Sequence, residues 1–138
     1  MEKKSGIDCV FVIPSNSKKS YQKLSETYSA IEPPTWALLL AQSIRSVNFN
    51  PKILDAVAEN LSEEEIFTRI KLMSPKLICI VVYGQNVNAG TTNMSGAVNV
   101  INYLKNNKIG KSISLIGSHA QALPKETLEK EKNIDFIF

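Results

Sequence analysis

Four connections of this 138-residue chain hold the residues that could bind a ligand. They follow the apolar runs of the sequence and cover residues 14–32, 55–61, 83–92 and 117–124. The first is far longer than the ~2–6 residues of an ordinary strand-to-helix turn, and the third is small and polar throughout after Tyr83. Connections of this kind are usually retained for a function, so ligand binding is the first chemistry to consider there.

Common phosphate-binding and catalytic motifs are missing from these connections. No G-x-G-x-x-G follows the first apolar run and no G-x-x-x-x-G-K-[ST] occurs in the sequence, which excludes a dinucleotide fingerprint and a P-loop. His119 is the only imidazole that could act as a base, and no G-x-S-x-G elbow presents a serine to it. A small hydrolase would therefore need His119 within hydrogen-bond reach of a serine.

The two cysteines are predicted to be structural. Cys9 and Cys79 each lie inside an apolar run, which favours small buried core residues over a disulfide or a metal pair. With one His and no C-x-x-C motif, the sequence indicates no zinc or iron–sulfur site of its own. Two free thiols suit a reducing compartment, and we expect a cytoplasmic protein.

Charge and composition favour an ordinary globular domain. Basic side chains outnumber acidic ones by 16 to 13, and the lysines are scattered in ones and twos, so no basic face for nucleic acid is expected. The apolar-rich stretch 31–44 contains Glu32 and two prolines, so no membrane span is expected. The length corresponds to a single domain, residues 1–138.

The spacing of apolar residues predicts the elements that must position the connections. Continuous apolar runs are typical of strands covered on both faces, as in a parallel sheet. They cover residues 7–13, 52–55, 77–83, 113–116 and 134–138.

Helices are predicted between these strands. Pro33-Pro34 can open the first helix, Ser62 and Glu65 form a capping box for the second, and Thr92 or Asn93 caps the third. A short fourth helix starts at Pro124. The alternation predicts the α/β class, a doubly wound five-stranded parallel sheet of flavodoxin-like or Rossmann-like type in three α/β/α layers.

Several segments resemble one known family. Residues 12–17, 21–25 and 31–34 resemble the opening of the cobalamin (vitamin B12)-binding domains that precede radical S-adenosylmethionine (SAM) domains. Leu54-Asp55-Ala56 supports the resemblance. The stretch 115–124 looks like the family's Gly-Gly-x-His-x-x-x-x-Pro stretch, with Ser118 in place of the second Gly. The resemblance covers nearly the whole chain, and its elements come in the right order.

The resemblance implies a cofactor-binding domain rather than a complete enzyme. This chain would hold and position cobalamin, while the iron–sulfur cluster, SAM and the methyl-transfer or ring-forming chemistry would belong to a radical SAM domain in cis or in trans. The corrin would lie on the strand ends, and its nucleotide tail would enter a slot between sheet and helices. The residues expected to contact cobalamin are Ser15, Asn16, Ser17, Tyr21, Leu24, Tyr83, Gly84, Gln85, Asn86, Gly90, Thr91, Thr92, Gly117, Ser118, His119, Ala120, Leu123 and Pro124.

One departure from the wider class of cobalamin modules bears on cobalt. Classical modules carry Asp-x-His-x-x-Gly after the first strand, and its His replaces the nucleotide base under cobalt. Residues 14–19 contain no His, as is frequent in the radical-enzyme branch, so we expect base-off cobalamin without a protein imidazole ligand. His119 is either a loop residue that bonds backbone or a contact to the corrin rim.

A second function class remains open beside this one. The missing His and the Ser118 substitution are the reasons to retain an alternative, in which the chain is a stand-alone interaction or small-ligand module that does not bind cobalamin. Both faces of the run 134–138 are apolar, so we also expect that Phe138 is not a natural free terminus.

Overall fold

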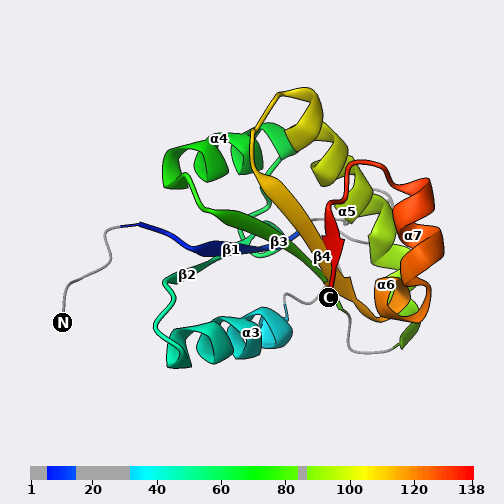
Figure 1. Ribbon diagram of the computed structural model, residues 1–138, viewed down its shortest axis with the longest axis horizontal. Coiled ribbons are helices and arrows are strands. Elements are labelled where there is room, and N and C mark those ends of the chain that lie inside the picture. Colours follow the sequence, from blue (N-terminus) through cyan, green and yellow to red (C-terminus); the bar gives the residue numbers. More distant parts are fainter. Residues whose placement is uncertain (1–5, 15–31, 84–86) are drawn as a thin grey trace.

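The computed structural model describes residues 6–14, 32–83 and 87–138, without the side chains of residues 87–89 and 92 (Figure 1). The strands are β1 (Cys9–Ile13), β2 (Pro51–Asp55), β3 (Leu77–Val82), β4 (Ser112–Gly117) and β5 (Phe136–Ile137). The helices are α3 (Thr35–Ser46), α4 (Glu63–Met73), α5 (Val87–Asn106), α6 (Ser118–Ala122) and α7 (Pro124–Lys130).

All five strands join one parallel sheet in the order β2-β1-β3-β4-β5. Helix α3 covers one face, and α4, α5 and α7 lie over the other (Figure 1). The predicted α/β class, the doubly wound parallel sheet and the three layers are therefore confirmed. The strand order reverses between β1 and β3, and both strands end at the same edge of the sheet.

The two faces of the sheet carry separate apolar cores because side chains alternate along each strand. Val10 and Val12 of β1 face the core under α4 and α5, while Cys9 and Phe11 face α3. The first core is the larger one, and it includes Ile66, Ile70, Ala97, Val100, Ile101 and Leu104 from the helices. Burial of these side chains supplies the main favourable free energy of the fold.

Local signals in the sequence explain where α4 begins and ends. The Ser62 Oγ accepts a hydrogen bond from the Glu65 N–H at 3.3 Å, and the Glu65 carboxylate accepts one from the Ser62 N–H at 2.8 Å. This is the predicted capping box, and it satisfies two backbone donors that the first helical turn leaves unpaired. At the other end, Ser74 takes a left-handed conformation with φ 44°, and Pro75 follows.

Helix α5 begins earlier than the sequence predicts. The expected cap was Thr92 or Asn93, but the helix starts at Val87 and places Thr91 in its second turn. Gly and β-branched Thr are poor helix formers, so helix propensity alone does not predict this first turn of the helix. Tertiary contact accounts for it, since Gly90 is buried against the Ser118 side chain and the Val82 carbonyl.

The face under α3 keeps exposed aromatic residues. Phe136 pairs with Ser114 across β4 and β5, so both lie on the face opposite to the larger core. Phe136 and Phe138 are 50% and 58% exposed, and Trp36 of α3 is 49% exposed. In the described part of the chain, α3 is the one helix on this face (Figure 1).

Asp135 fastens β5 to its neighbours. Its carboxylate accepts hydrogen bonds from the Lys105 Nζ and from the Ile113 N–H, each at 2.7 Å, while its own N–H donates to the Ile113 carbonyl at 2.9 Å. Partial burial raises the pKa of Asp135, but the two hydrogen bonds and the charge of Lys105 outweigh it and hold that pKa below its ordinary value of 3.8.

We expect Asp135→Asn to destabilise the fold in a pH-dependent way. Because the folded-state pKa is lowered, the ionised carboxylate stabilises the protein above pH 3.8, and this stabilisation is lost as pH falls through the lowered pKa. At neutral pH the variant should lose about 0.5 kcal/mol in free energy of unfolding, because the ion pair is partly exposed. Urea titrations at several pH values test this, with Glu129→Gln as control. A difference that persists unchanged in acid would contradict the assignment.

Candidate functional site

The carboxyl ends of β3 and β4 bring two of the predicted connections together. Val82 and Gly117 are register partners, so Tyr83 and Ser118 begin neighbouring connections at the same edge of the sheet. This is the edge where open α/β sheets bind their ligands, beside the point where strand order reverses.

Tyr83 links the sheet edge to helices on both faces. Its hydroxyl donates a hydrogen bond to the Gln121 Oε1 of α6 at 2.8 Å. Its ring stacks on Trp36 of α3, with the ring centroids 4.6 Å apart and the planes inclined by 25°. Gln121 was not among the expected contacts, although it falls within the predicted stretch 117–124 and carries the amide that such an edge would use.

His119 contacts another expected site residue. Its Nδ1 lies 3.3 Å from the Thr91 Oγ1 of α5, and either group can be the donor, depending on the imidazole tautomer. His119 is partly buried and belongs to α6, whereas Thr91 is exposed. Among the described residues this is the one side-chain hydrogen bond of His119, and it pairs the imidazole with a threonine hydroxyl.

The small residues of the edge allow close packing between segments of the protein. A Cβ at Gly117 would overlap the Val82 carbonyl oxygen, and a Cβ at Gly90 would overlap the Ser118 Oγ. Ala120 is fully buried. These three positions let β3, β4, α5 and α6 approach closely at the edge, while Ser118 and His119 keep part of their surface exposed.

The remaining predicted contacts divide into exposed and undescribed positions. Leu123 and Pro124 lie at the start of α7 and are exposed. Thr92 is within α5, and its side chain is outside the description. Ser15, Asn16, Ser17, Tyr21, Leu24, Gly84, Gln85 and Asn86 lie outside the described residues.

The thiols are buried beside one another under α3. Burial raises the pKa of Cys9 to about 12, with the neighbouring Cys79 and Asp8 adding to the rise, and burial raises the pKa of Cys79 to about 11. Across residues 6–14, 32–83 and 87–138, no three His, Cys, Asp or Glu side chains gather as a metal would require. None of the helices in these ranges combines the length and apolarity needed to cross a membrane.

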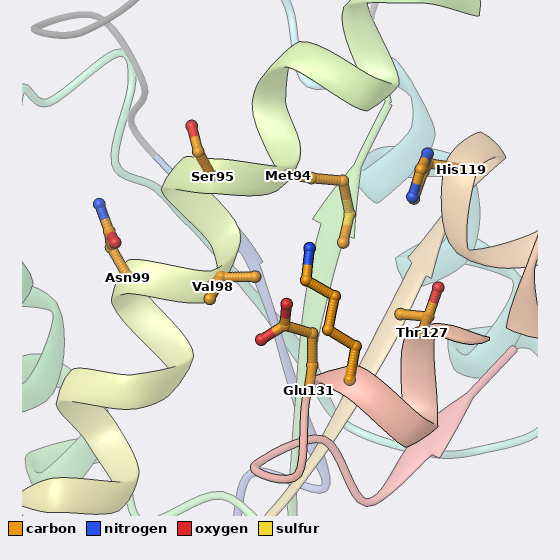
Figure 2. Close-up of a pocket in the computed structure, with 8 residues that line it drawn as sticks. Met94, Ser95, Val98, Asn99, His119, Thr127 and Glu131 are labelled. Carbon is orange, nitrogen blue, oxygen red and sulfur yellow. The ribbon is translucent and has the colours of Figure 1, made fainter. Parts of the chain in front are cut away.

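A pocket that sequence reasoning missed lies between α5 and α7. It has a volume of about 340 Å³ and is lined by Met94, Ser95, Val98, Asn99, His119, Thr127, Lys130 and Glu131. Figure 2 shows Met94 and Val98 on α5 opposite Thr127 and Glu131, with His119 at one end. Only His119 carried a sequence signal, because the other residues gather through helix packing across long sequence separations.

Comparisons with known proteins place the fold. No protein-family model and no curated protein sequence matches this chain. A similar solved structure is that of the radical SAM methyltransferase TsrM from Kitasatospora setae, with tryptophan substrate and the SAM analogue aza-SAM bound. The TM-score is 0.62 at 14% identity, over 90% of this chain and 21% of that one. The chain thus spans about a fifth of the matched enzyme, and the likeness shows a shared fold.

We expect Gly117→Ala to destabilise the protein strongly for so small a change. The added methyl group would overlap a backbone carbonyl, which cannot move without separating β3 from β4. Overpacking of this kind costs about 1–3 kcal/mol. Thermal unfolding of the variant measures it, and Gly6→Ala is the matched control because nothing lies within 4 Å of its added Cβ. Equal melting temperatures for both variants would contradict the packing argument.

We also expect the two thiols to resist thiol–disulfide exchange in the folded protein. The thiolate is the reactive form, and the raised pKa values of Cys9 and Cys79 keep both groups protonated at pH 8. Both thiols of the folded protein should react with a chromogenic disulfide about tenfold more slowly, or slower still, than the same thiols of the protein unfolded in denaturant. Fast reaction of both thiols without denaturant would show that the face under α3 opens readily.

Proposed function

We propose that this domain binds cobalamin and positions it for a radical SAM enzyme. The observation that carries the proposal is the sheet edge at Val82 and Gly117, where the pairs Tyr83–Gln121 and Thr91–His119 present polar hydrogen-bonding groups. The sequence resemblance to cobalamin-binding domains and the fold shared with part of a radical SAM methyltransferase support it.

The chemistry of the edge fits a neutral, amide-rich ligand. Corrin carries peripheral amide groups, which need both donors and acceptors, and the Gln121 amide, the Ser118 hydroxyl and the His119 imidazole offer both. Ser118 and His119 are partly exposed, so a ligand on the strand ends can reach them. In the described part of this edge, no lysine or carboxylate takes part in the Tyr83 and His119 contacts, which suits a ligand whose only anionic group is one phosphodiester.

The face under α3 fits the nucleotide tail of the same ligand. Trp36 and Tyr83 form a stacked pair at the mouth of this face, and Phe136 and Phe138 expose aromatic surface beside β4. An aromatic base and a sugar would bury apolar area there, which is the main source of affinity for a large flat group. Residues of β4 and β5 would then hold the tail, while α6 holds the corrin rim.

The proposed division of labour assigns no catalytic residue to this chain. When bound, cobalamin would supply methyl-transfer chemistry at cobalt, and the iron–sulfur cluster and SAM would be held by a radical SAM domain in cis or in trans. This chain would bind cobalamin, orient it and shield it. The neighbour's chain is nearly five times as long as the segment matched here, which leaves room for such a second domain in that enzyme.

The first test is retention of cobalamin by the purified chain. Hydroxocobalamin mixed with the protein and then desalted should leave visible absorbance of the base-off form. Phe136→Arg, which puts a charge on the face under α3, should lower retention, whereas Leu72→Arg, at an 81% exposed position on α4, should not. A colourless protein would favour the alternative, a stand-alone module of the same fold that takes another partner.

The second test concerns the lower face of cobalt. Residues 14–19 lack the His that classical modules place under cobalt, so we expect no protein nitrogen on cobalt. Electron paramagnetic resonance of the Co(II) form should show no nitrogen splitting, and His119→Ala should leave the spectrum unchanged. Loss of one neutral hydrogen bond should weaken binding by roughly tenfold or less. A three-line splitting that disappears in His119→Ala would instead make His119 a ligand.

A further inference from the structure

The ends of α3 and α4 lie at the same edge of the sheet. Each of these helices leads into the start of the next strand, α3 into β2 and α4 into β3, and all strands are parallel. The two helix ends and the strand starts therefore share the amino edge, which is opposite to the proposed ligand site. At the left of Figure 1, the end of α4 and the end of α3 flank the starts of β1 and β2.

Basic side chains that are scattered along the sequence gather at this amino edge. They come from the last turns of α3 and α4 and from the strand starts that follow, and all of them are exposed: Arg45, Lys52, Lys71 and Lys76. The segments 45–54 and 70–78 contain no acidic residue. The edge is therefore positively charged on both sides of the sheet.

Little of this charge is neutralised within the part of the chain that the structure describes. Arg45, Lys52 and Lys71 form no ion pair with another described residue. Lys76 pairs with Asp8 at 2.7 Å, but the Lys76 side chain stays 74% exposed, whereas Asp8 is buried. An anionic partner can thus reach all four basic groups from solvent.

Helix dipoles explain only part of this pattern. A cation is favoured by the partial negative charge of a helix end, which accounts for Arg45 and Lys71. The effect falls off beyond the last turn, so it does not account for Lys52 in β2 or for Lys76. Acidic residues 63–65 form the first turn of α4, at its opposite end. Charge is therefore separated between the two edges beyond what the helices require.

Each of the two helix ends also projects an apolar side chain. Leu72 is 81% exposed, more than any other large apolar residue of the described ranges, and Val47 is 62% exposed. The two residues, here called the apolar tips, lie on opposite sides of the sheet because α3 and α4 cover opposite faces (Figure 1). A protein partner would need two separate apolar pockets to receive them, whereas a lipid surface offers one continuous apolar layer beneath charged headgroups.

We propose that the amino edge binds peripherally to an anionic lipid surface. The four basic side chains would attract the acidic headgroups, and each contributes about fivefold in affinity. Val47 and Leu72 would enter the boundary between headgroups and acyl chains. Three of the four basic residues are lysines, whose compact charge requires no fixed partner geometry and suits mobile headgroups. This contact requires no membrane-crossing segment, and it does not rest on cobalamin binding.

This orientation would leave the proposed ligand site accessible. Val82 and Gly117 end their strands at the carboxyl edge, so the Tyr83–Gln121 and Thr91–His119 contacts would face away from the lipid. A ligand and a second domain can then approach the carboxyl edge from solvent while the amino edge rests on the membrane.

The first test is co-sedimentation of the complete chain with vesicles in the absence of cobalamin. One preparation contains two parts of phosphatidylcholine to one part of phosphatidylglycerol, and the control preparation contains phosphatidylcholine alone. We expect binding to the neutral vesicles to be at least about tenfold weaker, because the headgroup attraction is lost. High salt should weaken the binding to anionic vesicles, because charges are screened beyond about 10 Å at 0.1 M salt.

Two matched pairs of variants locate the contact. Leu72→Ser should weaken vesicle binding by about tenfold, whereas Leu38→Ser, at a half-exposed position in the first turn of α3, should not change it. Lys71→Gln should weaken it by about fivefold, whereas Lys125→Gln, at the start of α7, should not. All four positions are exposed, and circular dichroism checks that each variant is folded.

Trp36 reports which end of α3 faces the lipid. It is the single tryptophan of the chain and lies in the first turn of α3, roughly 15 Å along the helix from Val47. Its emission should therefore stay unchanged when vesicles bind. A blue shift of the emission would instead show that the carboxyl edge enters the lipid, against the proposal.

Three further results would overturn the proposal. Absence of binding to anionic vesicles at low salt would exclude the lipid partner. Equal losses within either pair of variants would show a general effect rather than a site. Tighter binding of oligouridylate or poly-L-glutamate than of vesicles, unaffected by Leu72→Ser, would assign the edge to nucleic acid or to an acidic protein. Because cobalamin is absent, none of these results depends on the outcome for the proposed function.

Discussion

The close approach of β3 and β4 at their carboxyl ends is the constraint on which the site depends. Gly117 sits against the Val82 carbonyl, and no side chain fits between the two strands there. Because these residues are register partners, the spacing fixes where α6 begins and where Tyr83 leaves the sheet. The Tyr83–Gln121 and Thr91–His119 contacts follow from that placement and not from any strong attraction of their own.

The same edge uses small residues twice. Gly90 brings the first turns of α5 onto the Ser118 side chain, so the long helix lies close to α6 while its later turns bury Ala97, Ile101 and Leu104 in the larger core. Packing free energy from that core therefore holds a helix start made of poor helix formers. Geometry at the edge is set by burial far from it, which is how a rigid sheet positions residues on its connections.

The sequence predicted the strands well, and it predicted the helix boundaries and the packing of the helices less well. Continuous β-branched runs identified the five strands, and the capping box at Ser62 located α4, because both signals are local. The start of α5 was placed too late, since Gly90 and Thr91 are helical through tertiary contact alone. The predicted parallel sheet also placed residue 83 next to residues 117–121, because the ends of neighbouring parallel strands lie at the same edge. The pocket with Thr127 and Glu131 could not be predicted, because it depends on how α5 and α7 pack.

Trp36 gives this protein an optical property that follows from one stacked pair. It is the single tryptophan of the chain, it is half exposed, and its ring lies on Tyr83, whose hydroxyl is bonded to Gln121 of α6. The indole emission of the folded chain therefore arises at the mouth of the sheet edge and nowhere else. A chromophore that arrives there would quench it, so the molecule carries its own fluorescent reporter for that edge.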